Sequence, residues 1–313
     1  MVKENIAVSI IMSVYNAENY LNEAIDSILN QTFQDFEFII VEDASTDSSY
    51  KILKEYEDKR IKIIRNKSNI GLTRSLNKAL KYATGKYIAR MDADDICMPT
   101  RLEKQIHYME KHRNVALISC SFMRFGESEQ KTIIRMNEVQ IKGQLMFGSV
   151  LPHPGFIFRR EIYSKYKIRY NEKMKYAQDY DFQVRVARKF KIACLPDILI
   201  KYRVSDKQIS SQKSLEQQEC ANRVRQSQLY YYGIKCNQKQ IELIRRIYMD
   251  EQSEFKIPQI MNAYIFLIRI VVKMNQSKFA EKKVISEIAV SYISKLNRVI
   301  KGRWEKKILL LGK

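Results

Sequence analysis

The chain of 313 residues has few of the side chains that build disulfide frameworks, zinc sites or low-complexity regions. It contains five cysteines, three histidines, nine glycines and five prolines. Because the cysteines are odd in number, scattered and without a CxxC pair, neither a disulfide scaffold nor a zinc site of the usual spacing is expected. We expect free thiols in a reducing cytoplasm. The low glycine and proline content excludes a collagen-like or low-complexity chain.

The sequence also lacks the glycine-rich motifs GxGxxG and GxxxxGKS/T, which cradle the phosphates of dinucleotides and nucleoside triphosphates. We expect no signal peptide, because the first apolar run is interrupted at Ser9 and Ser13 and no small-residue cleavage site follows it. The best candidate for a membrane span, Ala263 to Val272, is ten residues long and contains Arg269. That run is too short to cross a bilayer, so we expect a soluble or peripheral protein.

Positive charge is what the sequence has in excess. There are 55 Lys and Arg against 35 Asp and Glu, a net charge of +20, in a chain that is 45% hydrophobic. Residues 1–200 carry 32 basic and 25 acidic side chains, whereas residues 201–313 carry 23 and 10. Such an excess attracts anions, which could be nucleic acid, an acidic membrane surface or a phosphorylated substrate. The uneven distribution suggests that the two parts of the chain have different tasks.

The first 120 residues alternate between short apolar runs and helical stripes of apolar residues. This alternation predicts an α/β fold with a mostly parallel central sheet flanked by helices. The expected strands are Val8–Met12, Phe36–Val41, Ile61–Ile64, Tyr87–Met91 and Val115–Ser119.

Beyond residue 120 the pattern is looser. Strands are expected at Phe156–Phe158 and Cys194–Tyr202, with a helix from about Tyr180 to Phe190 between them. From about residue 213 onward the pattern is helical throughout. We therefore predict a catalytic domain over residues 1–210, with halves at about 1–120 and 121–210, and a basic helical module over 211–313.

Carboxylates follow two of the predicted strands. Glu42 and Asp43 come after the second strand, and Asp92, Asp94 and Asp95 come after the fourth. Ligands of such sheets bind at the carboxyl ends of the strands. Three aspartates within four residues repel one another unless a cation or an array of donors is present, and oxygen ligands suit Mg²⁺ or Mn²⁺. The alternative is a solvated acidic turn that caps the next helix.

A third acidic segment, AQDYDF, contains Asp179 and Asp181 at the start of a predicted helix. Aspartates at helix starts are most often caps, and we expect this role for one of the two. The other could then act as a base at the same face of the sheet.

Taken together, these segments resemble the family 2 inverting glycosyltransferases, which have the GT-A nucleotide-diphospho-sugar-binding fold. The resemblance covers roughly residues 6 to 205, and the segments occur in the family's order and spacing. They are VSIIMSVYNAENYLNEAIDSILNQTFQDFEFIIVEDASTDSS, NIGLTRSLNKALKYATGKYIARMDADD, RLEKQ, LPHPGFIFRR and AQDYDF.

The resemblance implies roles for residues at the first two strand ends. Ser13 and Tyr15 should lie beside the nucleotide. Asp43 matches the aspartate that hydrogen-bonds a uracil-type base, with Glu42 nearby. The donor implied is a nucleotide-diphospho-sugar, most often a UDP-sugar.

The resemblance also implies a metal site and a base. Asp95 should be the direct ligand of Mn²⁺ or Mg²⁺, with Asp94 near the ribose and the metal and Asp92 orienting them. Asp179 matches the catalytic base, although family members usually have an acidic residue where this chain has Gln178. The implied reaction is a metal-assisted single displacement that inverts the anomeric centre. The signature QxxRW of processive synthases is missing, so transfer of one sugar per encounter is expected.

Two further residues are candidates for contact with the acceptor or the departing diphosphate, although a lone histidine is more often structural. His153 lies in LPHPGF, and Arg203 follows Tyr202 in the last predicted strand. Family members often have a histidine shortly after this YR pair, whereas Asp206 and Lys207 occupy that region here. This difference puts the histidine contact in doubt.

The basic C-terminal module has two interpretations. It could be a small helical bundle with a solvated basic surface. The alternative is peripheral attachment to the anionic inner face of the plasma membrane, where family members meet a lipid-linked or growing cell-surface glycan. The final segment, which contains the single tryptophan, Trp304, is a candidate anchor.

Three other functions compete with the glycosyltransferase interpretation. A nucleic-acid-binding protein would need aromatic residues interleaved with Arg and Lys, or a recognisable reading helix, and the sequence has neither. A nucleotidyltransferase of similar architecture usually carries a glycine-rich basic loop after the first strand, and VYNAENY has no glycine. A catalytically inactive scaffold is disfavoured because Asp43, Asp94, Asp95 and Asp179 are all present.

Overall fold

The computed structural model of the chain describes residues 6–204, 214–248 and 255–311. The chain divides into two compact units. The first unit comprises Met1–Asn137 and Leu151–Ser214, and the second comprises Glu138–Val150 and Leu215–Lys313. The predicted boundary at residue 210 therefore needs one change, because residues 138–150 leave the first unit and pack with the C-terminal helices.

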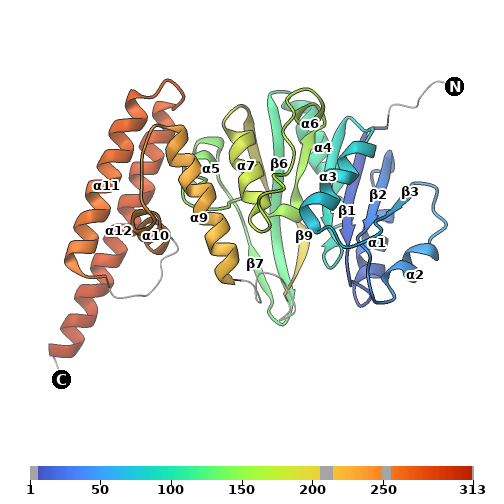
Figure 1. Cartoon of the computed structure of the whole chain (residues 1–313), viewed down its shortest axis with the longest axis horizontal. Helices are drawn as coiled ribbons and strands as arrows, with labels where there is room; N and C mark the ends of the chain where they lie inside the picture. The colour runs from blue at the N-terminus through green and yellow to red at the C-terminus, as the bar shows by residue number, and fades with distance from the viewer. Residues whose placement is uncertain (1–5, 205–213, 249–254, 312–313) are drawn as a thin grey trace. The chain divides into compact units, whose positions relative to one another are not determined.

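The first unit is built on one curled, mixed sheet with helices around it (Figure 1). Its strand order is β3-β2-β1-β4-β8-β6-β9-β5, with β7 paired to β6. Strands β1 to β4 run parallel to one another, as do β6 and β9, while β8, β5 and β7 are antiparallel to their neighbours. The strands are β1 (Val8–Val14), β2 (Phe36–Glu42), β3 (Ile61–Arg65), β4 (Tyr87–Asp92), β5 (Ile96–Cys97), β6 (Val115–Gly126), β7 (Gln130–Thr132), β8 (Ile157–Arg159) and β9 (Lys191–Val204).

These strands confirm the predicted α/β class and all seven expected strands. They form because their apolar residues are buried on both faces of the sheet, which gives continuous rather than alternating runs. In β1, only Ser13 among the seven residues is more than slightly exposed. The sequence pattern missed β5, which has two residues, and β7, whose residues Gln130–Thr132 form no apolar run.

Helices cover the sheet with faces that match the predicted stripes. In α1, the apolar positions Leu21, Ala24, Ile25 and Ile28 are all fully buried. Their spacing of three and four residues places them on one side of the helix. The helices of this unit are α1 (Leu21–Leu29), α2 (Ser49–Lys54), α3 (Leu72–Tyr82), α4 (Arg101–Lys111), the 3₁₀ helix η1 (His153–Gly155), α6 (Glu161–Ser164) and α7 (Gln178–Ala187).

Two arginines lie in the interior of the sheet domain. Arg101 of α4 is fully buried and donates to the backbone carbonyls of Arg90 at 2.8 Å and Phe156 at 3.3 Å. Arg90 itself, on β4, is 2% exposed. These hydrogen bonds match donors of the buried Arg101 guanidinium with acceptors and fix α4 against the last residues of β4. That is the strand whose end carries the acidic segment.

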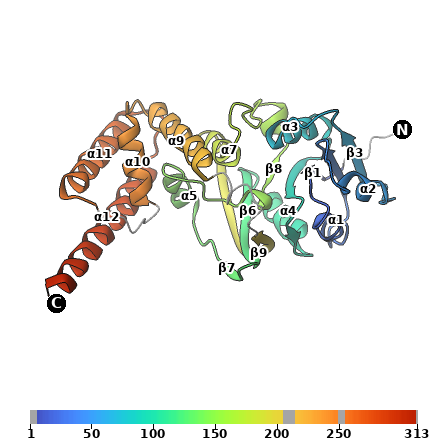
Figure 2. The same cartoon turned by 60° about the horizontal axis from the view of Figure 1, so that its bottom comes forward.

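The second unit is helical. It contains α5 (Glu138–Gln144), α9 (Ser214–Tyr231), α10 (Gln238–Tyr248), α11 (Ile257–Gln276) and α12 (Lys282–Leu311). At its centre Phe147 is fully buried and stacks on Tyr248 and on Tyr292, each with ring centroids 5.3 Å apart. In Figures 1 and 2, α11 and α12 run side by side, and the two helices are in contact. The helical pattern predicted from about residue 213 is confirmed for the described part of this region.

One helix of this unit corrects the expectation that no segment is long enough to cross a bilayer. Among the described residues, α11 is long and apolar enough to do so by length and composition alone. A third of its apolar window is buried inside the protein, and the core helix of a soluble protein passes the same test. Trp304 lies within α12, but its side chain is outside the part that the structure describes.

Candidate functional site

The acidic segments meet at the carboxyl edge of the parallel strands. In the strand register, Ser13 of β1 is paired with Asp92 of β4, and Val14 is paired with Glu42 of β2. The three strands therefore end at the same level of the sheet. The loops that follow them carry the predicted site residues to one edge, where α/β sheets bind their ligands.

The loops after β1 and β2 are tied together by hydrogen bonds. The backbone N–H of Asn16 donates to Ser45 Oγ at 3.1 Å, and the backbone N–H of Thr46 donates to Asn16 Oδ1 at 2.9 Å. Tyr15, immediately before Asn16, is 48% exposed, while Ser13 is half-buried at the end of β1. The pair is thus held at the strand edge with an aromatic ring open to solvent, as a base-stacking position requires.

Asp43 is buried and has protein donors at both carboxylate oxygens. Its Oδ1 accepts from Asn66 Nδ2 at 2.7 Å and from the backbone N–H of Ile70 at 2.9 Å. Its Oδ2 accepts from the backbone N–H of Gly71 at 2.8 Å. Gly71 has a φ of 86°, which few other residues adopt, and it precedes α3. Asp43 therefore orders the segment before α3, in addition to any role in recognising a base.

Glu42 also has protein partners. It is fully buried, its Oε2 accepts from Arg65 Nε at 3.1 Å, and its Oε1 accepts from the backbone N–H of Ser45 at 2.5 Å. The side chain thus helps to shape the loop after β2 on which the nucleotide was predicted to lie. It contributes to the site by holding that loop in place.

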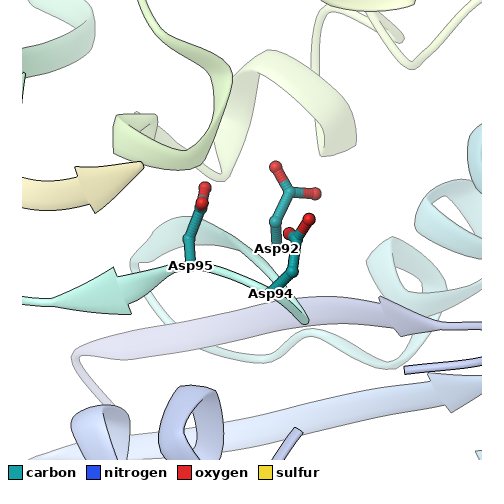
Figure 3. A group of neighbouring side chains, drawn as sticks. All are labelled: Asp92, Asp94 and Asp95. Carbon is teal, nitrogen blue, oxygen red and sulfur yellow. The ribbon is translucent and has the colours of Figure 1, made fainter. Parts of the chain in front are cut away.

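Asp92, Asp94 and Asp95 form a compact cluster in the turn between β4 and β5. One carboxylate oxygen from each lies within 4.8 Å of the others. Figure 3 shows the three side chains projecting to the same side of that turn. Asp95 is 1% exposed, and the other two are half-buried. The predicted grouping of these carboxylates is therefore present in the fold.

The three aspartates differ in their partners. Asp92 forms a bidentate ion pair with the buried guanidinium of Arg90, which offsets its charge. Asp95 Oδ1 accepts from the backbone N–H of Arg203 at 2.8 Å, whereas Asp95 Oδ2 is buried and has no hydrogen-bond partner among the described residues. Burial raises the pKa of Asp95 well above its usual range, and the neighbouring charges of Asp92 and Asp94 raise it further.

This arrangement fits a divalent cation. A buried carboxylate oxygen without a partner costs free energy, which a cation bound at that oxygen would recover. Asp95 supplies such an oxygen, and Asp94 supplies a second carboxylate within reach. Oxygen ligands of this kind are those that Mg²⁺ and Mn²⁺ prefer. The donor set therefore agrees with the metal site that the sequence predicts at Asp95 and Asp94.

Arg203, at the end of β9, holds the acidic turn from the side. In addition to its backbone bond to Asp95, its Nε donates to the backbone carbonyl of Asp94 at 2.8 Å. Its Nη2 forms an ion pair with Glu23 of α1. One residue thus connects two aspartates of the cluster to the first helix of the unit.

The guanidinium of Arg203 also lies between two aromatic rings. Its Cζ is 4.2 Å from the ring centroid of Tyr20 and 4.3 Å from that of Phe125. These contacts differ from the predicted role of Arg203 as an acceptor or diphosphate contact, because the side chain is engaged by the protein itself. The neighbouring Asp206 and Lys207 lie outside the residues that the structure describes.

Asp179 and Asp181 lie in the first turn of α7, and they have different environments. Asp181 is 7% exposed and pairs with Arg185 one turn later at 2.7 Å. Neither aspartate is the N-cap, since Ala177 occupies that position with a φ of 56°. The expected cap is thus replaced by an ion pair, and Asp179 is half-buried.

The hydroxyl of Tyr170 connects α7 electrostatically with the acidic turn. Burial raises the pKa of Tyr170, the positive charge of Arg90 lowers it, and the carboxylates of Asp179 and Asp92 raise it further. Both carboxylates therefore lie within electrostatic range of the same buried hydroxyl.

His153 lies in the interior beneath this region. It is 8% exposed, its Nε2 is 2.9 Å from Tyr170 Oη, and its ring meets those of Phe156 and Tyr170 edge-on. Burial lowers the pKa of His153 well below its usual value, and the charge of Arg90 lowers it further. These contacts favour a neutral, structural role for His153, and its contact with the acceptor or diphosphate stays a prediction.

Sequence reasoning missed Arg90, Glu23 and Asn66, although one of them carries a signal. Arg90 is a charged residue inside an apolar strand, two positions before Asp92. Because side chains two apart on a strand share a face, this spacing predicts a contact between the two. Glu23 and Asn66 carry no such signal, since their partners are 180 and 23 residues away in the chain.

Comparison with known proteins decides the family. The sequence model of glycosyl transferase family 2 matches residues 9–167, which is about half of the chain. The chain belongs to glycosyltransferase family 2. The resemblance seen in the sequence is thereby confirmed, and with it the assignment of this protein as an enzyme that transfers a sugar from a nucleotide sugar.

Two curated relatives illustrate the family. An uncharacterized glycosyltransferase of Haemophilus influenzae is 37% identical over 238 residues, which cover 72% of this chain and 74% of the relative. The Escherichia coli protein WfgD, named as a UDP-Glc:α-D-GlcNAc-diphosphoundecaprenol β-1,3-glucosyltransferase, is 33% identical over 67% of this chain and 81% of its own length.

Two solved structures confirm the GT-A fold of this glycosyltransferase. Staphylococcus aureus TarS 1-349, in complex with UDP-GlcNAc, aligns with 95% of this chain and 92% of its own, at a TM-score of 0.63 and 17% identity. The Pyrobaculum calidifontis mannosyltransferase PcManGT, in complex with GDP-Man and Mn²⁺, covers 96% and 87% at a TM-score of 0.53 and 15% identity.

The position of Arg203 predicts an indirect effect on metal binding. In Arg203→Ala, the acidic turn loses its links to Glu23, and we expect the Mn²⁺ concentration for half-maximal activity to rise about 10-fold or more, as for other residues that orient metal ligands. The measurement is a Mn²⁺ titration of sugar transfer. Arg124→Ala, an exposed arginine of the adjacent strand β6, is the control. If Arg203→Ala needs the same Mn²⁺ concentration but transfers sugar more slowly, the result would favour the predicted contact of Arg203 with the diphosphate.

The burial of His153 predicts a pH-dependent stability. Because its pKa is lowered in the folded state, the unfolded chain binds a proton that the folded chain does not bind when the pH falls below the ordinary histidine value of 6.5. His153 thus costs the folded state about 1.4 kcal/mol for each pH unit below that value. Urea unfolding at neutral and mildly acidic pH should show a smaller loss of stability in His153→Gln than in the unaltered protein. Equal losses in the two proteins would mean that His153 becomes protonated in the folded state.

Proposed function

We propose that this glycosyltransferase uses a UDP-sugar and transfers one hexosyl or N-acetylhexosaminyl unit to a hydroxyl of a lipid-linked or growing cell-surface glycan, with inversion at the anomeric carbon. The names of two similar proteins support the donor class: WfgD is named for UDP-Glc, and TarS was solved with UDP-GlcNAc. WfgD is also named for a diphosphoundecaprenol-linked acceptor, which supports a lipid-linked glycan. The anomeric configuration of the product, measured by nuclear magnetic resonance, tests the inversion.

The nucleotide would bind at the ends of β1 and β2. Tyr15 presents an exposed ring on which a base can stack, and Ser13 is half-buried beside it. Asp43 Oδ2 has a single backbone donor at 2.8 Å, and a carboxylate oxygen can accept a second bond, here from the N–H of a uracil-type base. Glu42 would support the loop rather than touch the nucleotide.

Asp95 and Asp94 would hold a divalent cation, Mn²⁺ or Mg²⁺. When bound, such an ion stabilises negative charge on the departing diphosphate. The observation that carries this proposal is Asp95 Oδ2, a buried carboxylate oxygen that has no partner in the described part of the chain and belongs to a cluster of three aspartates. The mannosyltransferase PcManGT, which was solved with Mn²⁺, gives further support.

Asp179 would act as the general base. As the acceptor hydroxyl oxygen forms a bond to C1 of the sugar, the bond from C1 to the diphosphate oxygen breaks, and the hydroxyl proton passes to the Asp179 carboxylate. The products are the glycoside, UDP and a protonated Asp179, which then returns its proton to water. Gln178, in place of an acidic neighbour, leaves Asp179 with one fewer negative charge beside it.

The second unit would attach the enzyme to the anionic inner face of the plasma membrane, as a peripheral protein with its active site in the cytoplasm. The excess of basic side chains in residues 201–313 supports this attachment, since anionic headgroups attract juxtamembrane lysines and arginines. A lipid-linked acceptor would be presented at the same surface. Nucleic acid is not an expected partner, because the family assigns the anionic ligand as a nucleotide sugar. The same family assignment replaces the nucleotidyltransferase alternative.

The metal assignment predicts a loss of nucleotide binding in Asp95→Asn. In the unaltered protein, UDP with Mn²⁺ should stabilise the fold by about 2.7 kcal/mol at a concentration 100 times its Kd. In the variant this stabilisation should disappear, because the amide cannot replace the carboxylate as a cation ligand. Thermal unfolding with and without UDP and Mn²⁺ is the measurement. Asp35→Asn, an exposed aspartate before β2, is the control, and unchanged UDP binding in Asp95→Asn would refute the assignment.

The base assignment predicts that Asp179→Asn loses sugar transfer but keeps donor binding. Donor binding should be retained, because Asp179 is not among the proposed nucleotide or cation ligands. The kcat of transfer should fall by about 10² to 10⁴-fold, which is the usual contribution of a general base. Transfer from a labelled UDP-sugar and the UDP-dependent thermal shift, measured on the same sample, check both halves. Turnover close to that of the unaltered protein would exclude Asp179 as the base.

A further inference from the structure

Helix α11 in the second unit exposes a continuous stripe of large apolar side chains. Five residues of this one helix have between 47% and 61% of their surface exposed. They are Ile257, Met261, Ile265, Ile268 and Val272. Single exposed apolar residues are normal on a protein surface, but five in succession along one helix mark an interaction site.

The spacing of these residues places them on one face. Ile257, Met261 and Ile265 are four apart and form one row along the helix, while Ile268 and Val272 form the neighbouring row. The first row continues in the same direction as Arg269 and Lys273. The exposed face of α11 is therefore apolar over its first half and gains cations toward its end.

The opposite face of α11 already has partners. Its buried positions belong to the core that α11 shares with α10 and α12, and they are Ile260, Ala263, Phe266, Leu267, Ile270 and Met274. The helix is thus apolar on two sides, which explains why its composition alone is sufficient for a membrane span. A spanning orientation would remove the buried side from this core. The exposed side can contact a membrane only if the helix lies along the surface.

Helix α11 itself carries charges of one sign, and the exposed Glu281 in the turn that follows it pairs with Lys142. Helix α11 contains no aspartate or glutamate, and its charged residues are Arg269 and Lys273. The turn that follows carries Lys278, and Lys282 begins α12. Between them, Phe279 is 55% exposed. Residues 215–313 carry 19 basic and 9 acidic side chains in all. An apolar surface bordered by cations matches the chemistry of an anionic lipid surface.

We propose that the exposed face of α11 lies in the interface of an anionic bilayer, with the five apolar side chains among the acyl chains and Arg269 and Lys273 at the lipid phosphates. This assignment deepens the membrane attachment proposed above by naming the surface that makes it. A second copy of the chain fits less well, because α11 offers no carboxylate to pair with the cations of a facing α11.

The test is flotation of the full-length protein with vesicles. We expect the unaltered protein to float with vesicles of equal parts phosphatidylcholine and phosphatidylglycerol, and to remain behind with phosphatidylcholine alone. The double variant Ile265→Glu with Ile268→Glu places two carboxylates in the stripe and should reduce the bound fraction by about 10-fold or more. The double variant Arg269→Glu with Lys273→Glu should reduce binding to anionic vesicles to a similar extent.

A matched control separates this effect from a general one. Leu215→Glu changes a residue that is 75% exposed on α9 of the same unit, and it should float like the unaltered protein. The UDP-dependent thermal shift is measured for every variant. Its retention in a variant that no longer floats shows that the fold and the donor site are intact. If the unaltered protein shows no UDP-dependent thermal shift, the proposed function is refuted, whereas the proposed membrane surface is not.

Several outcomes would overturn the assignment of this surface. Flotation of the stripe variant equal to that of the unaltered protein would do so, as would failure of the unaltered protein to float with anionic vesicles. Resistance to extraction by alkaline carbonate would indicate that the chain spans the bilayer. Light scattering provides the last check, since a molecular mass that halves in the stripe variant would assign the face to a second copy.

Discussion

The active-site edge depends on how this protein accommodates negative charge at the end of one strand. Asp92, Asp94 and Asp95 lie within 4.8 Å of one another, and Asp95 is almost fully buried. Such a cluster is unfavourable by itself, because burial and mutual repulsion both oppose ionisation. The fold offsets part of this cost with the buried Arg90, which neutralises Asp92, and with Arg203, which holds the turn through Asp94 and Asp95. Asp95 Oδ2 is still buried without a hydrogen-bond partner among the described residues, so a cation bound at this edge would be stabilising.

The two halves of the sheet contribute different residues to that edge. Strands β1, β2 and β4 end level with one another and carry their loops to one edge, while β9 supplies Arg203 from the other half. Helix α7 carries Asp179, whose charge, like that of Asp92, raises the pKa of the buried Tyr170 hydroxyl. Family 2 glycosyltransferases carry out sugar transfer on a GT-A fold, and here the residues that orient the ligands come from segments as far apart as Glu23 and Arg203. Residues without any predicted role thus determine the geometry of those that have one.

In the second unit the unfavourable feature is exposed apolar surface rather than clustered charge. Helix α11 buries one face in a core and leaves an equally apolar face exposed. Because exposed apolar surface is unfavourable in water, a face of this kind implies an environment that covers it. The cations along its border restrict that environment to one of negative charge. The proposed metal and nucleotide sites of the first unit and the proposed membrane surface of the second together describe an enzyme whose acceptor would lie at a lipid surface.

The sequence by itself determined the α/β class, the order of the main strands and helices, the family and the grouping of Asp92, Asp94 and Asp95. These features are local, since strand periodicity and adjacent motifs can be read along the chain. Three roles required the tertiary structure. His153 and Arg203 proved to be engaged by the protein, and Asp181 pairs with Arg185 instead of capping α7. The membership of residues 138–150 in the second unit also emerged only from the fold. The roles of His153 and Arg203 and the membership of residues 138–150 depend on distant partners or on burial, which a residue's immediate neighbours do not encode. The Asp181–Arg185 pair is local, since the two residues are four apart on one helix.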